Sequence, residues 1–456
     1  YDDTGVRGEA VVEPLTHYGV GRVIKDFRNG QSAIGGVFTT VNRDLPSELS
    51  FLRENAFTGG LTARHRWQNG NFRLTGFLVG SHVTGDTAAI NRTQRSSARY
   101  FQRPDNDYTD YDPTRTSLSG YAGGVEFFKT GGGHWRYAAV LNARSPGFEV
   151  NDLGFMQNAD QILQVAYVGY DQFKPGKLFR RWDVNVNQWT GWNYGGDNNS
   201  FAGNINGSME LHSAWDFWWS VNRDQPRMSE GMLRGGPLMR VNGSTGFNVG
   251  FDSDERKAFN YWFSFNYRAE DETDGRSLGF YPGARWRLGN RAELRLSPNI
   301  SLDNRAAQYI DQLSENGNDV YLFGELNQVT TSLTTRLSYT FSPNLSLQLY
   351  AEPFISAGDY EQYLQVTNPR ASKFDDRFAS YNGSVDNPDF NVRALRSNAV
   401  LRWEYRPGSA LFLVWSQGRE AFSEYGDYEF SRDADRLFGS KATNVLLIKA
   451  TYWLGL

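Results

Sequence analysis

Apolar and polar residues alternate along residues 291–305, RAELRLSPNISLDNR. Between Ala292 and Asp303 the even positions are apolar or proline and the odd positions are polar or charged. A strict period of two predicts a β-strand with one apolar and one polar face. Twelve such residues would extend roughly 40 Å, about twice the usual strand of a globular protein. The apolar face of so long a strand needs a cover that this segment does not itself provide.

The same alternation recurs along the chain, for example in 258–268, 276–288, 331–341 and 344–353. Nineteen segments between residues 17 and 456 qualify as strands, including one predicted over 237–252. We find no convincing amphipathic helix, because no stretch keeps apolar residues at helical spacing. The pattern therefore predicts an all-β chain.

Short and long connections alternate between these strands. The short ones are 28–31, 68–71, 130–133, 288–291, 342–344 and 406–409, several of which contain Asn-Gly, Gly-Gly or Pro-Gly, the residues of tight hairpins. The long ones are 43–55, 84–114, 146–159, 224–236, 305–318, 366–388 and 422–442. Tight turns at one end and long loops at the other are typical of outer-membrane barrels. A soluble sandwich or propeller is the alternative, but it would need a second layer on every apolar face.

We therefore predict an antiparallel transmembrane outer-membrane β-barrel of about 20 strands, within a range of 18–22, as a single domain over 1–456. Bacterial barrels have even strand numbers, so the nineteen segments leave one strand to be found. Either residues 1–14 supply it or it lies upstream of Tyr1. The absence of an eighteen-residue apolar run argues against a membrane-spanning helix, but barrel strands are half polar and escape that test.

The amino-acid composition excludes several classes of function. The chain has no cysteine, which excludes disulfides and thiolate chemistry, and its net charge of −4 does not favour nucleic acid. Aromatic residues make up 15%, and those near strand ends suggest the aromatic girdles of a membrane protein. The residues concerned are Trp192, Tyr194, Trp218, Trp219, Tyr405 and Trp453. A sugar-stacking platform is the alternative reading of the same residues.

Four stretches resemble one family of bacterial outer-membrane proteins. They are SPGFEVNDLGF (145–155), residues 98–124, LRWEYRPGSALFLVWSQGRE (401–420) and VLLIKATYWLGL (445–456). The family is an uncharacterised barrel, a domain of unknown function, that usually follows a periplasmic module similar to family-nine carbohydrate-binding modules. The resemblance implies a Gram-negative outer-membrane location, and such a module or other envelope proteins as partners besides lipid. This chain departs in lacking that module and in ending at Leu456 rather than at an aromatic residue.

One predicted outer loop, DNDYTDYDP (105–113), contains Asp105, Asp107, Asp110 and Asp112. Clustered carboxylates suit Ca²⁺, which takes six to eight oxygen ligands. The spacing is not that of an EF-hand. The alternatives are a solvated acidic loop, or neutralisation of the aspartates by Arg103 and Arg115.

The loop that begins at Ser145 carries the family signature, and its interleaved apolar residues suggest a structural plug. The signature residues are Ser145, Pro146, Gly147, Phe148, Glu149, Asn151 and Asp152. Glu149 and Asp152 could be read as a glycosidase acid pair, but a plug segment is the simpler reading. The five histidines have no metal-ligand spacing and no nucleophile motif is present, so we predict that the chain is not an enzyme and carries no cofactor other than this calcium.

Strand parity assigns twelve charged residues to the lumen. They are Arg240, Arg268, Arg285, Arg287, Arg295, Arg336, Arg396, Arg402, Glu293, Asp303, Glu352 and Glu404. Eight arginines against four carboxylates would make this part of the wall positive and favourable to anions. Alternatively, arginines and carboxylates pair across the wall and select nothing, for example Arg402 with Glu404 and Arg295 with Glu293.

Two functions follow from this pattern. The first is a pore or transporter for polar solutes, in which the excess of arginine would favour anions. The second is a non-conducting scaffold in the outer membrane whose surface loops bind glycans, ions or protein partners. The sequence names neither the solute nor the oligomeric state.

Overall fold

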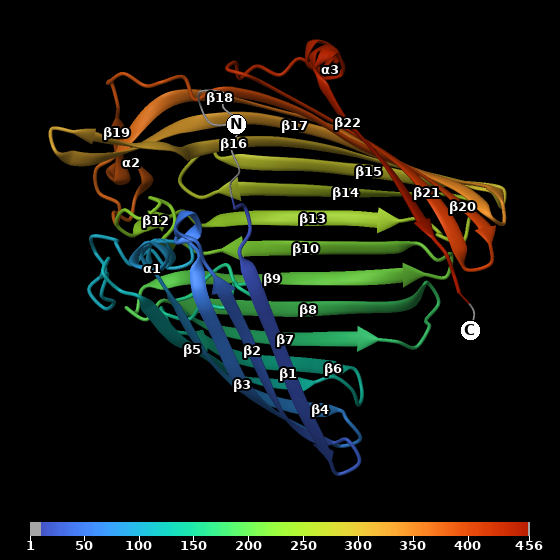
Figure 1. Cartoon of the computed structure of the whole chain (residues 1–456), viewed down its shortest axis with the longest axis horizontal. Coiled ribbons are helices and arrows are strands. Elements are labelled where there is room, and N and C mark those ends of the chain that lie inside the picture. Colours follow the sequence, from blue (N-terminus) through green and yellow to red (C-terminus); the bar gives the residue numbers. More distant parts are fainter. Residues whose placement is uncertain (1–10, 455–456) are drawn as a thin grey trace. The chain divides into compact units, whose positions relative to one another are not determined.

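The computed structural model describes residues 11–454, and within them strands dominate (Figure 1). Twenty strands belong to one antiparallel sheet, and two short strands form a second sheet. The large sheet comprises β1 (Leu15–Phe27), β2 (Ser32–Asp44), β3 (Arg53–Trp67), β4 (Phe72–Gly85), β5 (Ser117–Lys129), β6 (Trp135–Arg144), β7 (Gln161–Gln172), β8 (Phe179–Trp192), β9 (Asn198–Leu211), β10 (Asp216–Asp224), β13 (Ser244–Asp252), β14 (Phe259–Glu270), β15 (Arg276–Leu288), β16 (Ala292–Glu315), β17 (Asn318–Ser342), β18 (Leu345–Val366), β19 (Phe378–Ser380), β20 (Phe390–Arg406), β21 (Ser409–Ser423) and β22 (Ala442–Thr451). The strand sought in residues 1–14 falls mostly outside the described residues.

The backbone contacts divide the chain into two units. The first contains residues 1–171, 184–204 and 224–241, and the second contains 172–183, 205–223 and 242–456. In the first unit β1 to β7 pair in chain order. In the second, β13 to β18 and then β20, β21 and β22 pair in chain order, with β19 on the end of β18. Most strands within each unit thus pair with the next strand of the chain, as the sequence predicted.

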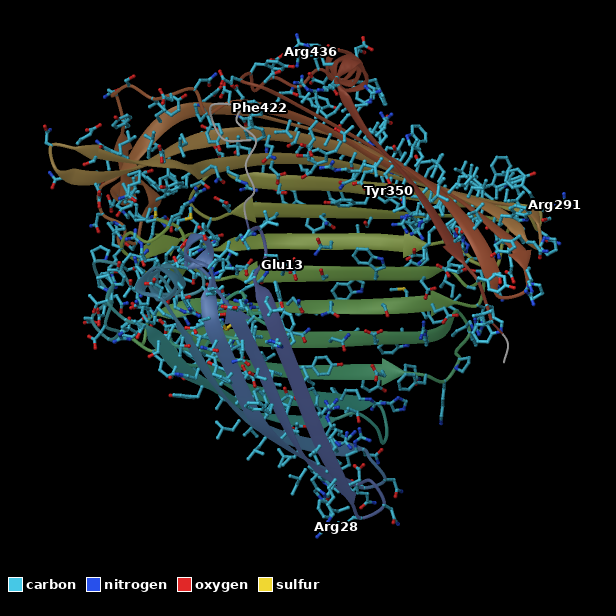
Figure 2. The ribbon with its side chains drawn as sticks, viewed as in Figure 1. Glu13, Arg28, Arg291, Tyr350, Phe422 and Arg436 are labelled. Carbon is cyan, nitrogen blue, oxygen red and sulfur yellow. The ribbon has the colours of Figure 1, made fainter. Side chains whose placement is uncertain are left out.

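Tight turns join consecutive strands where the sequence placed them. The turn between β1 and β2 has positive φ angles at Arg28 (51°), Asn29 (56°) and Gly30 (80°), and the turn between β3 and β4 repeats this at Gln68, Asn69 and Gly70. Figure 2 labels Arg28 in the first of these turns and Arg291 in the turn between β15 and β16. A left-handed backbone favours Asn and Gly, which explains why these dipeptides indicated the turns correctly.

The predicted long connection over 305–318 is wrong. β16 continues to Glu315 and β17 begins at Asn318, so the two strands extend past the expected loop and meet at Asn316 and Gly317 (Figure 1). Both turn residues have positive φ, 51° and 80°, which is the Asn-Gly hairpin signal. Two register shifts, after Arg305 and after Tyr309, break the period of two in this region. Because of these irregularities, the alternation of apolar and polar residues did not reveal this part of the strand.

The predicted strand over 237–252 is also wrong in part. It divides into β12 (Met239–Val241), which pairs with β11 (Arg227–Ser229) in the small sheet, and β13. The neighbours Leu238 and Met239 are both fully buried. Adjacent side chains of a wall strand face opposite sides, so two buried neighbours indicate packing among loops. Arg240 therefore belongs to the loop sheet and not to the wall.

The long connections contain short helices that the sequence did not reveal. They are α1 (Thr87–Gln94), α2 (Phe374–Arg377) and α3 (Phe430–Gly439), together with a 3-10 turn at Ser47–Leu49. The Glu429 side chain caps α3 by accepting hydrogen bonds from the backbone N–H groups of Ser431 and Arg432. No helix in residues 11–454 has the length and apolarity needed to cross a membrane.

In the first unit one face of the sheet is apolar, and no other element within residues 11–454 covers it. In the first unit Leu61 stands directly opposite Leu78, and their side chains are 67% and 61% exposed. Ile34, Phe38, Val125 and Leu141 continue this exposed apolar face across the neighbouring strands. Contiguous apolar surface of this kind marks contact with a membrane or a partner. Together with the antiparallel hairpins and the tight-turn pattern, it confirms the predicted fold class, an all-β sheet of outer-membrane barrel type.

Substitution on the apolar face should be far more costly than substitution on the opposite face. We predict that Leu61→Arg destabilises the protein folded in lipid vesicles by about 2–4 kcal/mol, because it places a charge in hydrocarbon. Thr62→Arg, the adjacent exposed residue on the other face, should change stability by less than about 1 kcal/mol. Urea titration of vesicle-folded protein measures both. Equal losses for the two variants would show that lipid does not cover the Leu61 face.

The tight turns and long loops of the second unit should lie on opposite sides of the membrane. Because the natural chain has no cysteine, Asn344→Cys in a tight turn and Asp376→Cys in a long connection each create a unique label site. Both positions are exposed. We predict that a membrane-impermeant maleimide labels Asp376→Cys on intact cells and labels Asn344→Cys only after lysis. Equal labelling of the two variants on intact cells would contradict this topology.

Candidate functional site

The segment that follows β6, residues 145–160, packs directly on the backbone of β5, and we call it the plug segment. Ser145 Oγ accepts a hydrogen bond from the Tyr121 N–H at 2.8 Å. A Cβ atom on Gly147 would lie 2.2 Å from the Ser119 carbonyl oxygen, and one on Gly120 would lie 2.1 Å from the Phe148 nitrogen. Glycine is needed at both positions because only a bare Cα permits so close an approach. The predicted packing role of this signature is therefore supported at Ser145, Gly147 and the buried Phe148.

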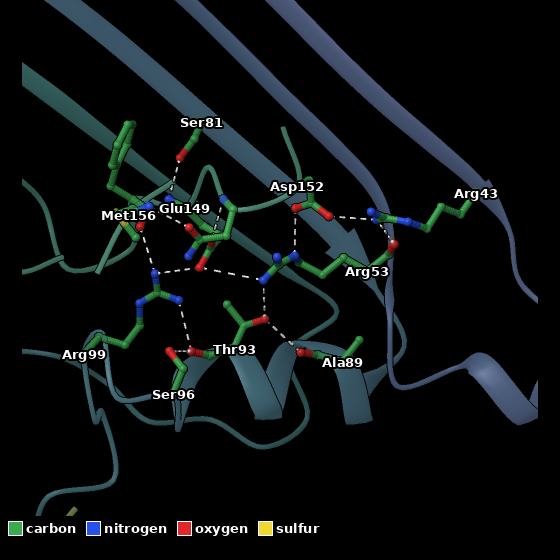
Figure 3. Close-up of polar contacts among 12 residues, drawn as sticks. Arg43, Arg53, Ser81, Ala89, Thr93, Ser96, Arg99, Glu149, Asp152 and Met156 are labelled. Carbon is green, nitrogen blue, oxygen red and sulfur yellow. Dashed lines mark hydrogen bonds and ion pairs between the residues drawn. The ribbon is translucent and has the colours of Figure 1, made fainter. Parts of the chain in front are cut away.

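Arginines from three elements hold the two carboxylates of the plug segment (Figure 3). Asp152 binds Arg43 Nη1 at 2.7 Å and Arg53 Nε at 2.8 Å. Glu149 binds Arg99 Nη2 at 2.9 Å and lies 3.7 Å from Arg53 Nη1. The Arg99 and Glu149 side chains are 0% and 3% exposed. Charge-assisted hydrogen bonds of this kind are the strong ones, so they fasten the plug segment to β2, β3 and the connection after α1.

These contacts argue against an acid pair at Glu149 and Asp152. Burial alone would raise the pKa of Glu149, but the positive charges of Arg99 and Arg53 and hydrogen bonds from the Asn151 N–H and Arg99 outweigh it and lower the pKa. A glycosidase acid needs a raised pKa to be protonated at neutral pH. Glu149 is instead an ionised partner of arginine. Asn151 completes the local structure, because its Oδ1 accepts from the Met156 N–H at 2.7 Å.

A second buried cluster in the first unit was not indicated by the sequence. Tyr108 donates to Asp160 Oδ2 at 2.6 Å, and Arg103 Nη2 lies 3.0 Å from the Tyr108 hydroxyl. Asn193 Nδ2 donates to Glu230 Oε1 at 3.0 Å. Burial and the nearby negative charge of Asp160 raise the pKa of Glu230 to about 7. Four separate segments supply these residues, so no local motif could have revealed them.

The predicted calcium cluster is not assembled. Asp105 Oδ2 accepts from the Leu238 N–H at 2.8 Å and its Oδ1 lies 3.8 Å from Arg103. Asp112 accepts from the Thr114 N–H and hydroxyl and lies 3.9 Å from Arg115. Within residues 11–454 no three His, Asp or Glu side chains, those of Asp107 and Asp110 included, are grouped so that they could hold a metal ion. For Asp105 and Asp112 the structure therefore agrees with the alternative to calcium binding, in which a nearby arginine neutralises the aspartate.

In the second unit, three arginines stand side by side on the face assigned to the lumen. The register places Arg285 opposite Arg295 and Arg295 opposite Arg336, on β15, β16 and β17. We call these three residues the arginine row. Directly opposite residues share a face at Cβ separations of about 5 Å, where like charges repel. A row of three like charges is therefore not what strand stability alone would select.

Aromatic rings and a carbonyl group contact the arginine row directly, and the carboxylates of Asp252 and Glu255, which line the same small cavity as Arg285 and Arg295, do not form ion pairs with it. The Arg295 guanidinium lies 4.5 Å from the centre of the Trp262 ring, and that of Arg336 lies 5.6 Å from the centre of the Tyr350 ring (Tyr350 is labelled in Figure 2). Arg285 Nη2 donates to the Glu255 carbonyl oxygen at 2.9 Å. In the described part of the chain none of the three forms an ion pair. The predicted pairing of Arg295 with Glu293 is therefore wrong, because Arg295 stacks on Trp262.

Other predicted wall arginines are neutralised or bound. Arg402 binds Glu404 at 2.6 Å, as one of the two alternatives predicted, and Arg396 binds Glu420. The remaining predicted residues have local partners: Arg268 donates to Ser244 Oγ, Arg287 to the carbonyl oxygens of Glu255 and Lys257, Asp303 accepts from Ser301, and Glu352 accepts from Tyr350. Glu293 stands opposite Arg287 in the register without an ion pair within residues 11–454. The face assigned to the lumen therefore contains both ion-paired arginines and the arginine row, which has no ion pair within residues 11–454.

A third cluster, also missed, fixes the connection between β21 and β22. Arg393 and Arg436 donate to the Tyr425 hydroxyl, both at 2.6 Å, and Arg432 lies 4.4 Å from the centre of the same ring. Asp433 is fully buried. Burial would raise its pKa, but hydrogen bonds from Arg432, Asn391, the Glu429 N–H and Tyr425 lower it to about 2. This cluster docks α3 on β20 and β21.

Comparison with known proteins shows the family of this chain and a distant similarity to solved structures. The sequence matches the family described as "Domain of unknown function (DUF5916)" over residues 2–456, and the chain belongs to that family. No curated protein matches it in sequence. Among solved structures it is similar to the FrpB iron transporter from Neisseria meningitidis (F3-3 variant), with a TM-score of 0.45, 11% identity and coverage of 88% of this chain and 67% of that chain. It is also similar to the siderophore receptor PirA from Acinetobacter baumannii, with a TM-score of 0.38, 9% identity and coverage of 97% and 71%.

Removal of the Glu149 charge should release the plug segment. We predict that Glu149→Gln lowers the free energy of opening of residues 145–160 by about 3–5 kcal/mol, because Arg99 is left buried without its counter-charge. Hydrogen exchange of this segment measures the opening. Asp427→Asn is the control, since its pair with Arg432 involves a carboxylate that is 69% exposed and should cost less than about 1 kcal/mol in its own loop. Equal, small effects of both variants would mean that the buried pair does not hold the plug.

The segment around Glu230 should become less stable as the pH rises. Its folded-state pKa of about 7 lies above the ordinary value of 4.5, so the stabilisation is complete below pH 4.5 and is lost as the pH rises through 7. The full change should approach about 3 kcal/mol. Opening free energies of residues 227–241, from hydrogen exchange at pH 5 and pH 8.5 corrected for intrinsic rates, test this. Glu230→Gln, which mimics the protonated form, should abolish the dependence, and an unchanged dependence in that variant would assign it to another group.

Proposed function

We propose that this member of the DUF5916 family is an outer-membrane protein of Gram-negative bacteria that passes polar solutes and favours acidic ones. The supporting observation is the arginine row, in which Arg285, Arg295 and Arg336 occupy adjacent register positions without carboxylate partners in the described residues. Guanidinium groups remain charged at every physiological pH. A charged row on a water-filled wall attracts anions and repels cations.

The row has the chemistry of a solute contact more than that of a structural brace. Elsewhere on the same face the protein places carboxylates next to arginine, as in Arg402 with Glu404 and Arg396 with Glu420. At the row it uses Trp262 and Tyr350, which support a guanidinium by cation–π contact without cancelling its charge. The charge therefore remains available to a passing anion, within the roughly 8–10 Å that screening by physiological salt allows.

Ion selectivity in planar bilayers tests the proposal. In a potassium chloride gradient the protein should conduct with a reversal potential that indicates preference for chloride. Arg295→Gln with Arg336→Gln should shift the reversal potential toward cations, because two uncompensated charges are removed. Arg402→Gln with Glu404→Gln is the matched control, since it removes one closed ion pair and changes no net charge. Preference for cations in the natural protein, or equal shifts for both double variants, would contradict the proposal.

A second function is supported by the plug segment. Its carboxylates are bound to Arg43, Arg53 and Arg99, a rigid arrangement that suits a non-conducting scaffold whose loops bind glycans, ions or proteins. Absence of conductance in bilayers, with correctly folded protein, would favour this alternative. A periplasmic carbohydrate-binding-like module or another envelope protein stays a proposed partner under either function. That the chain is not an enzyme also stays a prediction.

A further inference from the structure

A cavity of about 800 Å³ lies beside the plug segment in the first unit. Its wall includes Arg43 from β2, Arg53 from β3 and Arg92 from α1, together with the plug residues Glu149 and Asp152. Pockets for small molecules have volumes of about 300–1,000 Å³. The cavity is therefore large enough for a solute, and charged residues, two of them from the signature loop, form part of its wall.

The cavity has more positive than negative charge. Arg43, Arg53 and Arg92 contribute three positive charges to the lining, and Glu149 and Asp152 contribute two negative ones, which leaves a net charge of +1. The Glu149 charge is also shared with the buried Arg99 beneath the cavity. Both Asp152 oxygens are used, one by Arg43 and one by Arg53. A half-enclosed site whose lining is net positive favours an anionic ligand.

Arg92 and Arg43 also have N–H groups that donate no hydrogen bond within the described residues. Within residues 11–454 Arg92 has no hydrogen bond and no ion pair, and its guanidinium only stacks 5.6 Å from the centre of the Phe51 ring. Arg43 donates through Nη1 alone, to Asp152 and to the Arg53 carbonyl oxygen. The planar fork of a guanidinium binds a carboxylate through two parallel hydrogen bonds. Arg92 and Arg43 therefore retain the donors that such a ligand requires.

The rest of the wall is suited to a polar ligand body. It includes the hydroxyl groups of Thr93, Ser96 and Ser97 and the amides of Asn151, Gln157 and Asn158, beside the apolar Leu52, Ala89, Ala98 and Met156. Two aromatic rings complete it, and one of them, Phe155, is 84% exposed. Hydroxyl and amide groups both donate and accept hydrogen bonds. They match a ligand that carries hydroxyl groups between its charged ends.

We propose that this cavity binds a hydroxylated dicarboxylate, with Arg92 and Arg43 as its carboxylate contacts. The ligand would lie against residues 149–158 and so stabilise the plug segment in its docked position. This inference goes beyond the proposed function and does not depend on conduction, because binding to purified protein in detergent micelles is sufficient to observe it.

A series of probes with one carbon skeleton tests the charge requirement. D-glucarate has two carboxylates, D-gluconate has one and D-glucitol has none. Isothermal titration of the full chain in micelles should give affinities that fall in this order. Sulfate should bind more weakly than glucarate, since it offers two charges and no hydroxylated body. Equal affinities across the three probes, or sulfate binding as tightly as glucarate, would overturn the proposal.

Two matched arginine variants test the site itself. Arg92→Gln should weaken glucarate binding by about tenfold or more, the value of a charge-assisted hydrogen bond, without unfolding the protein, because Arg92 holds no part of the ion-pair network. Arg95→Gln is the control, since Arg95 is an exposed arginine at the end of the same helix and outside the cavity wall. Glucarate should also slow proteolysis of residues 151–158 in the natural protein and in Arg95→Gln. Equal binding by the two variants would overturn the assignment of Arg92.

Discussion

The structure depends on the requirement that both faces of a long strand be satisfied at once. A strand such as β16 presents apolar side chains on one side and charged ones on the other. Its backbone pairs with β17, and with β15 between Ala292 and Asn304 apart from a gap around Pro298. Among residues 11–454 no protein layer covers the exposed Leu61 and Leu78 on the apolar face. Lipid on that face and water on the other satisfy both sides, and only complete pairing of the backbone permits such an arrangement in a bilayer. The hairpin topology and the tight turns follow from this requirement.

Arginine serves two opposite purposes in this framework. At the plug segment and around α3 it is paired with buried carboxylates such as Glu149 and Asp433, so charge adds to the apolar packing that holds these loops. In the arginine row it is kept apart from carboxylates and held by aromatic rings. Burial of a paired charge costs desolvation energy that only good geometry offsets, whereas an exposed row retains its hydration. The difference in environment separates the residues that hold the fold from those that are available to a solute.

The sequence predicted the strand interiors because contact with lipid on one face and water on the other gives each wall strand a period of two. Leu294, Leu296 and Ile300 lie on one face as predicted, and the Asn-Gly and Gly-Gly turns join the strands they were expected to join. The reading failed where that period is broken, at the register shifts after Arg305 and at the buried neighbours Leu238 and Met239. Proline has a similar effect on pairing. The ladder between β15 and β16 is interrupted around Pro282 and Pro298, which lack an N–H to donate.

The sequence by itself determined the fold class, the facing of the wall residues and the existence of a packed signature loop. Each of these follows from a local pattern, either alternation or turn chemistry. Only the tertiary structure decided which charges are paired. Arg99 meets Glu149 across 50 positions of the chain and Tyr108 meets Asp160 across 52, while Arg295 avoids the nearby Glu293 and stacks on Trp262. Ion pairing depends on distances of a few ångströms between segments that folding brings together, and alternation along a strand contains no information about those distances.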